Sequence, residues 1–239
     1  MLFFLIRHGD PIYDPDSLTP LGQRQAEAAA RRLAVYGMDR IYASSSTRAQ
    51  QTARPTAEIL KKPVETLEWA HETLAWQQLT MTREDGRLTW AFAHPRCREL
   101  FRDPSVIGMG AEWYDHPAFA ETQFREGTLR IGREADAFFA ALGYRHLREE
   151  NCWLAVEPTK ERVALFAHQG FGLAFLSWIT DIPYPLFSTR FDMSHSNFTA
   201  VEFAGEKGEK IIPRVLTLSN DSHIYREGLP TLYQNKIPL

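Results

Sequence analysis

The chain has 239 residues, of which 44% are hydrophobic and 24% charged, and its formal net charge is −3. This composition is typical of a globular protein with one substantial core, and it offers no basic footprint for nucleic acid. The two cysteines, Cys97 and Cys152, have neither metal-site nor disulfide-framework spacing, which suits a reducing compartment. Because no signal peptide or membrane-spanning run is found, we expect a cytoplasmic protein that binds neither nucleic acid nor membrane.

The first part of the chain alternates between strand and helix patterns. The apolar run from Leu2 to Ile6 predicts a buried strand, and a polar loop follows over residues 10–17. Thr19 and Pro20 are typical of a helix start, and Gly37 of its end, which predicts a helix over residues 20–36. The next predicted elements are a strand over 39–43, a helix over 47–60 that Pro55 kinks, and a strand over 64–67.

The second part begins with a segment of irregular pattern over residues 76–126. We interpret it as an insertion over the core, helical in parts, whose tryptophans and arginines could form a cap on a ligand site. For any single one of these side chains, packing or solvation is the favoured interpretation. The remaining predicted elements are a helix over 129–142, a central strand over 162–167, a very apolar helix over 171–180, and strands over 197–203 and 211–218.

These elements predict a single α/β domain over residues 1–239, a three-layer α/β/α sandwich around a mainly parallel sheet. Pro213 cannot donate to a central ladder, which predicts that the last strand lies at an edge. Residues 76–126 would be an insertion in this domain.

Polar side chains follow three of the predicted strands. Arg7 and His8 end the first strand, His168 and Gln169 end the central strand, and Arg48 lies at the start of the helix after the second strand. Parallel strands bring their carboxyl ends to one crevice, and a helix start with an arginine favours anions. The sequence therefore predicts a pocket for a phosphoryl group, although each motif alone could be a polar turn.

The order and spacing of these motifs resemble the histidine phosphatase superfamily. The resemblance is carried by Arg7-His8-Gly9, Leu18-Thr19-Pro20-Leu21-Gly22, Ser46-Thr47-Arg48-Ala49-Gln50-Gln51-Thr52-Ala53 and Ala167-His168. It implies that His8 is phosphorylated, that Arg7, Arg48 and His168 hold the phosphoryl oxygens, and that an acid after the third strand protonates the leaving group. Spacing from Val64 favours Glu72 as that acid, and Glu68 is then a solvated residue.

The chemistry constrains the protonation of these groups. His8 must attack from an unprotonated nitrogen while its other nitrogen donates to a carbonyl near Gly9. His168 would serve better as a cation, and Glu72 must be protonated as the alcohol leaves, which burial and a nearby phosphate would favour.

Two positions depart from the family pattern. Asp14 occupies, by spacing, a place where the family often has asparagine, and we interpret it as a solvated residue of a shifted loop. Gln169 stands where glycine is common, and its side chain would narrow the pocket or reach the substrate. His195 precedes a predicted strand and is expected at the same sheet edge, as a loop residue with satisfied hydrogen bonds.

The resemblance implies a phosphatase that uses no metal or other cofactor and acts on a small phosphorylated substrate. The alternatives are a phosphoglycerate mutase-type phosphotransferase, which the sequence after Glu72 disfavours, and a non-catalytic phosphate sensor. A third alternative uses His8, Asp10, Asp14 and His168 as metal ligands, against which two neighbouring guanidinium groups argue. The fold cannot select the substrate, and the sequence leaves the oligomeric state open.

Overall fold

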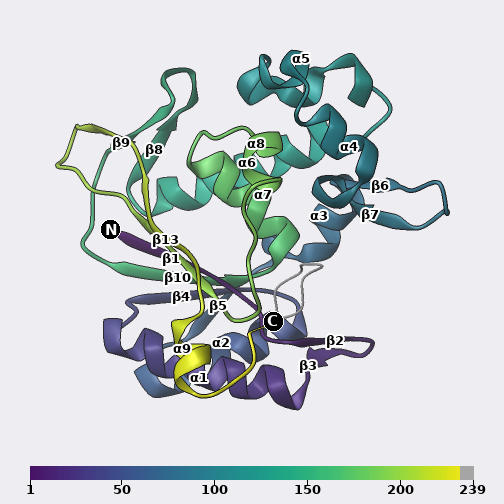
Figure 1. Cartoon of the computed structure of the whole chain (residues 1–239). Coiled ribbons are helices and arrows are strands. Elements are labelled where there is room, and N and C mark those ends of the chain that lie inside the picture. The colour runs from purple at the N-terminus through teal and green to yellow at the C-terminus, as the bar shows by residue number, and fades with distance from the viewer. Residues whose placement is uncertain (232–239) are drawn as a thin grey trace.

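A six-stranded sheet forms the centre of the protein in the computed structural model, which describes residues 1–231 (Figure 1). The strand order is β13-β11-β1-β10-β4-β5. Strands β1, β10, β4 and β5 run parallel, whereas β11 is antiparallel to both of its neighbours. The bounds of these strands are β1 Leu2–Arg7, β4 Arg40–Ser44, β5 Val64–Leu67, β10 Arg162–Ala167, β11 Phe198–Glu202 and β13 Arg214–Asn220.

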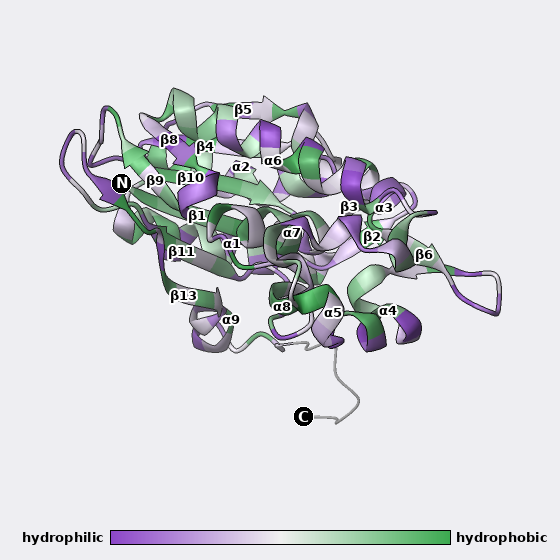
Figure 2. Ribbon diagram, turned by 90° about the horizontal axis from the view of Figure 1, so that it is seen from above, coloured by the Kyte–Doolittle hydropathy of each residue, from purple (hydrophilic) through white to green (hydrophobic). Residues whose placement is uncertain are grey.

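Helices cover both faces of this sheet. Helices α1 (Pro20–Tyr36) and α2 (Thr47–Leu60) lie on one face, and α6 (Phe124–Ala141) and α7 (Gln169–Ile179) lie on the other (Figure 1). The predicted α/β/α sandwich is therefore confirmed, and β13 lies at an edge of the sheet, as Pro213 predicted. Figure 2 shows the central strands as mainly hydrophobic, which is expected of strands that are buried on both sides.

Alternation along β1 divides the core in two. Phe4 and Ile6 belong to a cluster with the buried Leu33 of α1, whereas Phe3 and Leu5 belong to the larger cluster on the other face. On that face the ring of Phe3 lies 5.2 Å from the ring of Phe139. Successive side chains of a strand point to opposite faces, so the aromatic run of β1 serves both layers at once.

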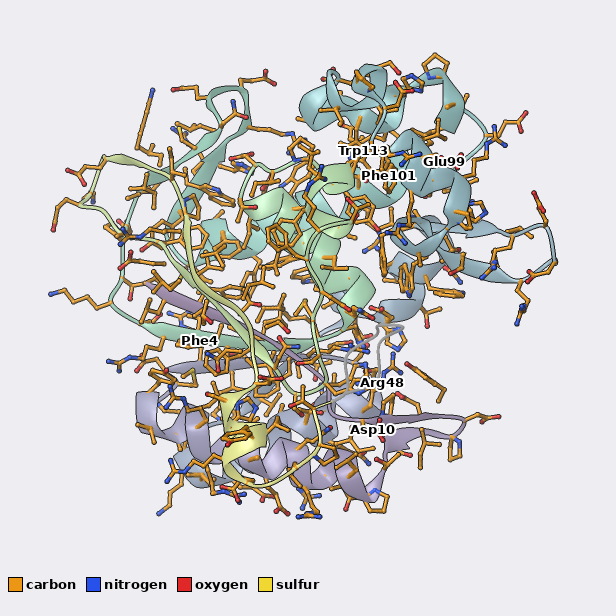
Figure 3. All side chains as sticks on the ribbon, in the orientation of Figure 1. Phe4, Asp10, Arg48, Glu99, Phe101 and Trp113 are labelled. Atoms are coloured by element: carbon orange, nitrogen blue, oxygen red, sulfur yellow. The ribbon has the colours of Figure 1, made fainter. Side chains whose placement is uncertain are left out.

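The region between β5 and α6 contains short elements that gather beside α7 and α8 (Tyr184–Ser188) (Figure 1). Figure 3 labels two of its core residues, Phe101 and Trp113, whose rings lie 5.4 Å apart. Trp113 is buried, in agreement with the packing interpretation of this tryptophan. The elements are η1 Glu68–Ala70, α3 Glu72–Gln78, β6 Thr80–Thr82, β7 Leu88–Trp90, η2 Ala91–Ala93, α4 Pro95–Leu100, α5 Pro104–Ile107, η3 Gly110–Asp115 and η4 Pro117–Phe119.

Three features differ from the predicted elements. The segment expected to be a loop after β1 forms a hairpin of β2 (Pro11–Tyr13) and β3 (Asp16–Leu18). Helix α6 begins at Phe124 rather than Leu129, and α7 begins at Gln169 rather than Phe171. The chain also forms elements that we did not predict, namely β8 Tyr144–Leu147, η5 Arg148–Glu150, β9 Cys152–Ala155, β12 Lys210–Ile211 and α9 Ser222–Arg226.

A close backbone contact fixes the loop after β1 against the start of α1. A Cβ atom added to Gly9 would lie 2.5 Å from the carbonyl oxygen of Gly22, and one added to Gly22 would lie 2.2 Å from that of Asp10. Neither contact tolerates a side chain, because both obstructing atoms are backbone. The two glycines therefore bring the segment that follows His8 onto the first turn of α1.

Within residues 1–231, no helix is both long and apolar enough to cross a membrane.

Candidate active site

The carboxyl ends of β1 and β10 bring two histidines together. Arg7 pairs with Ala167 in the parallel ladder, so His8 and His168 leave adjacent strands at the same level. Their ring centroids are 5.3 Å apart, and both side chains are buried. The convergence predicted from the two strand ends is thus present in the structure.

His8 is held in one tautomer by the backbone. Its Nδ1 lies 2.7 Å from the carbonyl oxygen of Gly9. A carbonyl can only accept, so Nδ1 carries the proton and Nε2 keeps its lone pair. Burial and the neighbouring guanidinium groups of Arg7 and Arg48 hold the pKa of His8 well below its ordinary value. The imidazole is therefore neutral near pH 7, with Nε2 as its basic nitrogen.

Two buried guanidinium groups flank His8. Arg7 donates to the carbonyl oxygen of Met193 and, over 2.8 Å, to Nε2 of His195. Arg48, in the first turn of α2, pairs with Asp16 at 2.7 Å. The Nε atoms of both arginines are buried and find no hydrogen-bond partner among the described residues. Unpartnered buried N–H groups are costly, so an anion in this crevice would satisfy them.

His168 is neutral in this structure, contrary to the expectation that it is a cation. Nη2 of Arg48 lies 3.2 Å from its Nδ1, and since arginine can only donate, Nδ1 is an acceptor. Its Nε2 then donates to Ser44 Oγ at 2.8 Å. Burial, followed by the charges of His8 and Arg48, lowers the pKa of His168 well below its ordinary value. Because the ring of His168 is fully buried and lies near the cationic Arg48 and Arg7, it does not take up a second proton.

Glu72 reaches the same crevice from the start of α3. Its two carboxylate oxygens accept hydrogen bonds from the backbone N–H groups of Gly170 (3.0 Å) and Phe171 (3.2 Å), in the first turn of α7. Burial of the carboxyl raises the pKa of Glu72 to about 7, although these amides and both arginines act in the opposite direction. Glu68 is exposed on η1, so the geometry distinguishes the two glutamates.

One residue at the site, Asp16, was not predicted, whereas His195 lies at the sheet edge where we expected it. Asp16, in the β2–β3 hairpin, binds Arg48 and also accepts from the backbone N–H of Thr47 at 2.7 Å. His195 lies 5.7 Å from His8 between ring centroids, and we had expected only an ordinary loop residue. Since Arg7 donates to its Nε2, the ring carries its proton on Nδ1, 3.5 Å from Oδ1 of Asp10.

His195 accepts from Arg7, but its buried Nδ1 has no hydrogen-bond partner among the described residues, so its hydrogen bonds are not all satisfied, contrary to our expectation. Burial and the nearby charge of Arg7 lower the pKa of His195 to about 3, so the ring stays neutral. Figure 3 shows Asp10 and Arg48 near the end of the sheet where the crevice lies.

Two further residues that the sequence analysis singled out, Asp14 and Gln169, lie outside the group of Arg7, His8, Arg48 and Glu72. Asp14 is exposed, in agreement with the solvated interpretation. Gln169 is buried at the start of α7 and donates to the carboxylate of Asp192. Of the four residues of the alternative metal site, His8 and His168 lie together, but no group of three or more His, Cys, Asp or Glu side chains within residues 1–231 is arranged to hold a metal.

A cavity of about 500 Å³ opens over these groups. Its charged end is made by Arg7, His8, Arg48 and Glu72, and its other lining residues are Tyr13, Thr73, Trp76, Trp90 and Gln169. A buried anion-binding end joined to a wider, less polar end is typical of a small-molecule site.

Comparisons with known proteins agree with this geometry. A model of the histidine phosphatase superfamily (branch 1) matches residues 3–114, which confirms the resemblance seen in the motifs. No curated protein matches the sequence.

Solved structures share the fold over nearly the whole chain. "Mycobacterial hydrolase 1" is 21% identical, with a TM-score of 0.58 and coverage of 92% of this chain and 98% of the other. A mycobacterial glucosyl-3-phosphoglycerate phosphatase is 19% identical, with a TM-score of 0.58 and coverage of 91% and 98%. A phosphoserine phosphatase variant from Entamoeba histolytica, in complex with phosphoserine, is 16% identical, with a TM-score of 0.57 and coverage of 93% and 98%. At these identities the likeness establishes the fold.

Proposed function

We propose that this member of the histidine phosphatase superfamily hydrolyses phosphate monoesters of small molecules through a phosphohistidine formed on His8. The observation that carries the proposal is the tautomer of His8, whose Nδ1–H is bound to Gly9 and whose Nε2 is left basic. Arg7 and Arg48 provide the positive charge that a phosphate dianion needs beside this nitrogen. Phosphatase activity in the structural neighbours from mycobacteria and Entamoeba histolytica supports the same reaction class.

In the first step, Nε2 of His8 attacks phosphorus and the bond between phosphorus and the alcohol oxygen breaks. Protonated Glu72 gives its proton to that oxygen, so the product leaves as a neutral alcohol. Arg7 and Arg48 hold the phosphoryl oxygens while charge builds on them. A bound dianion would also raise the pKa of His168, which then donates to the phosphoryl group.

In the second step, the carboxylate of Glu72 removes a proton from water, and this water attacks phosphorus. The bond between phosphorus and Nε2 breaks, inorganic phosphate forms, and both His8 and Glu72 return to their starting states. One carboxyl thus serves as acid and then as base, which requires a pKa near the working pH.

The experiment that tests this function is the hydrolysis of para-nitrophenyl phosphate between pH 5 and pH 8 in the presence of EDTA. We expect the wild type to be active and His8→Ala to lose activity about a thousandfold or more, because the variant lacks the nucleophile. His116→Ala is the control, since this half-buried histidine caps η4 in the region between β5 and α6.

A rapid alkaline quench should also trap a phosphorylated wild-type protein, because the phosphorus–nitrogen bond survives alkali. Activity of His8→Ala close to the wild-type level, or loss of wild-type activity in EDTA, would contradict the mechanism. We also propose a cytoplasmic location, which the buried free thiols Cys97 and Cys152 support.

A further inference from the structure

The part of the cavity over His8 that is lined by Tyr13, Trp76 and Trp90 is aromatic, and it is called the aromatic part below. Trp76 lies on α3 and Trp90 ends β7, and their rings meet edge to face with centroids 5.0 Å apart. Trp90 also stacks on Phe92 at 5.9 Å with an interplanar angle of 11°. Both tryptophans are half-buried, so each still presents ring surface to the cavity. Tyr13, on the β2–β3 hairpin, also lines the cavity and is 69% exposed.

Trp90 is held beside the proton donor. A Cβ atom added to Gly170 would lie 2.4 Å from two ring atoms of Trp90, so the indole rests directly on the first turn of α7. The backbone N–H of Gly170 is the one that binds Glu72. Trp90 therefore lies beside the carboxyl that gives its proton to the leaving alcohol, and it also lines the cavity that this alcohol would occupy.

Among residues 1–231, the aromatic part of the cavity has no arginine or lysine that could bind a second anion. Among the described residues that line this cavity, Arg7 and Arg48 are the only arginines or lysines, and both lie beside His8. The other polar residues there, Thr73 and Gln169, are neutral. Gln169 itself is bound to Asp192, an acidic group that would repel a carboxylate.

Arg96 does not line this cavity. It lines a separate cavity of about 970 Å³, which shares only Trp76 with the first, and Glu121 lines that same cavity. Beside the two tryptophans, the described lining therefore offers indole surface and neutral polar groups.

From these contacts we propose that the substrate is the phosphate ester of an uncharged alcohol that carries a flat aromatic group, which packs against Trp76 and Trp90. This inference rests on the proposed phosphatase function and adds the class of the leaving group to it. Aromatic rings favour edge-to-face and offset contacts with other rings, and burying an unpaired carboxylate against such surface is costly.

The test compares alkyl phosphates that differ little in leaving-group chemistry: 2-phenylethyl phosphate, ethyl phosphate, O-phosphoserine and 3-phosphoglycerate. We expect kcat/KM for 2-phenylethyl phosphate to exceed the values for the two charged substrates by about tenfold or more. Trp90→Leu should lower the ratio of kcat/KM for 2-phenylethyl phosphate to that for ethyl phosphate by about tenfold. The control Thr89→Val, at the preceding position of β7, should keep the wild-type ratio.

The outcomes distinguish a failure of the inferred substrate class from a failure of the proposed phosphatase function. Turnover that favours phosphoserine or 3-phosphoglycerate, or that treats all four substrates equally, overturns the inference and leaves the phosphatase function standing. An unchanged ratio in Trp90→Leu overturns the role of the tryptophan. If the wild type hydrolyses none of these esters and also fails on para-nitrophenyl phosphate, the proposed function falls and the inference falls with it.

Discussion

Two opposing influences act on the carboxyl of Glu72. Burial favours its protonated form, whereas the amides of Gly170 and Phe171 favour the carboxylate. The outcome is a pKa of about 7, which suits the proposed roles of this carboxyl as proton donor in the first step and proton acceptor in the second.

Glu72→Gln should therefore slow the hydrolysis of esters with poor leaving groups by about 10²–10⁴-fold, because an alkoxide needs a proton as it departs. Formation of the phosphoenzyme from para-nitrophenyl phosphate should slow far less, since that leaving group needs little assistance. Single-turnover release of ethanol and of para-nitrophenol would measure both effects, with Glu68→Gln as the matched control on the exposed η1. Equal slowing for both esters would exclude Glu72 as the acid.

The pH dependence of kcat/KM for ethyl phosphate should follow the protonation of Glu72 and of His8. The acid form of Glu72 exists below its pKa of about 7, and the basic form of His8 exists above a pKa well below its ordinary value. The rate should thus be level on the acidic side of neutrality and fall about tenfold for each pH unit well above 7. A series of initial rates from pH 5 to pH 9 would check this, and a rate that rises through pH 8 would contradict it.

At this scale, the sequence predicts side chains that follow a recognisable strand, and it misses the contacts of side chains on irregular segments. Arg7, His8 and His168 end strands whose apolar runs are plain, so their meeting follows from a parallel sheet. Asp16 and His195 reach the site through a hairpin and a returning loop, neither of which has a periodic pattern. The neutral state of His168 also depends on the contact with Arg48, which only the folded chain specifies.

Among the elements, the first turn of α7 does most to arrange the crevice. It follows His168, its amides bind Glu72, and the indole of Trp90 rests on Gly170. The packing of Trp90 against this turn explains why a glycine follows Gln169.

Gly170→Ala should lower the free energy of unfolding by about 1–3 kcal/mol, because the added methyl group would overlap the ring of Trp90. The same substitution should cost less in a Trp90→Leu background, where the ring is gone. Urea unfolding of the four proteins in this double-mutant cycle measures the coupling. Equal losses in both backgrounds would show that Trp90 does not limit space at this position.

Elements that carry their own caps or apolar pattern were predictable, whereas strands that depend on a pairing partner were not. The bounds of α1, α2 and β5 agree with the predicted helices and strand, because caps and apolar periodicity act within each segment. The strands β2, β3, β8 and β9 have three or four residues each, and pairing partners rather than propensity define them. The early start of α6 likewise reflects Phe124, a fully buried residue in the core around Trp113.

At the scale of the molecule, His146 contacts three parts of the chain, namely β9, α6 and the segment after α7. The ring stacks on Trp153 at 4.1 Å and pairs with Asp136 of α6 at 2.8 Å and with Asp181, after α7, at 3.0 Å. Burial lowers the pKa of His146, but the hydrogen bonds and charges of the two carboxylates outweigh it, so the pKa is raised. The folded protein therefore binds this proton more tightly than the unfolded chain does.

It follows that the stabilisation from His146 is complete below the ordinary histidine pKa of about 6.5 and is lost as pH rises through the raised value. His146→Gln should lower the free energy of unfolding by about 2 kcal/mol at pH 5.5, and by less at pH 9. Urea unfolding at the two pH values measures the difference. A loss that is the same at both would mean that packing on Trp153, rather than the ion pairs, accounts for the contribution.

The position of β1 in the sheet has a consequence for how the protein is made. This strand precedes both of its partners in the chain, and Leu2 pairs with Arg162 on one side and with Glu202 on the other. Such distant partners make the closure of the sheet a late and slow event in folding. His8 is therefore translated well before the two strands that flank β1, so chains that end short of β11 carry this histidine without the completed crevice around it.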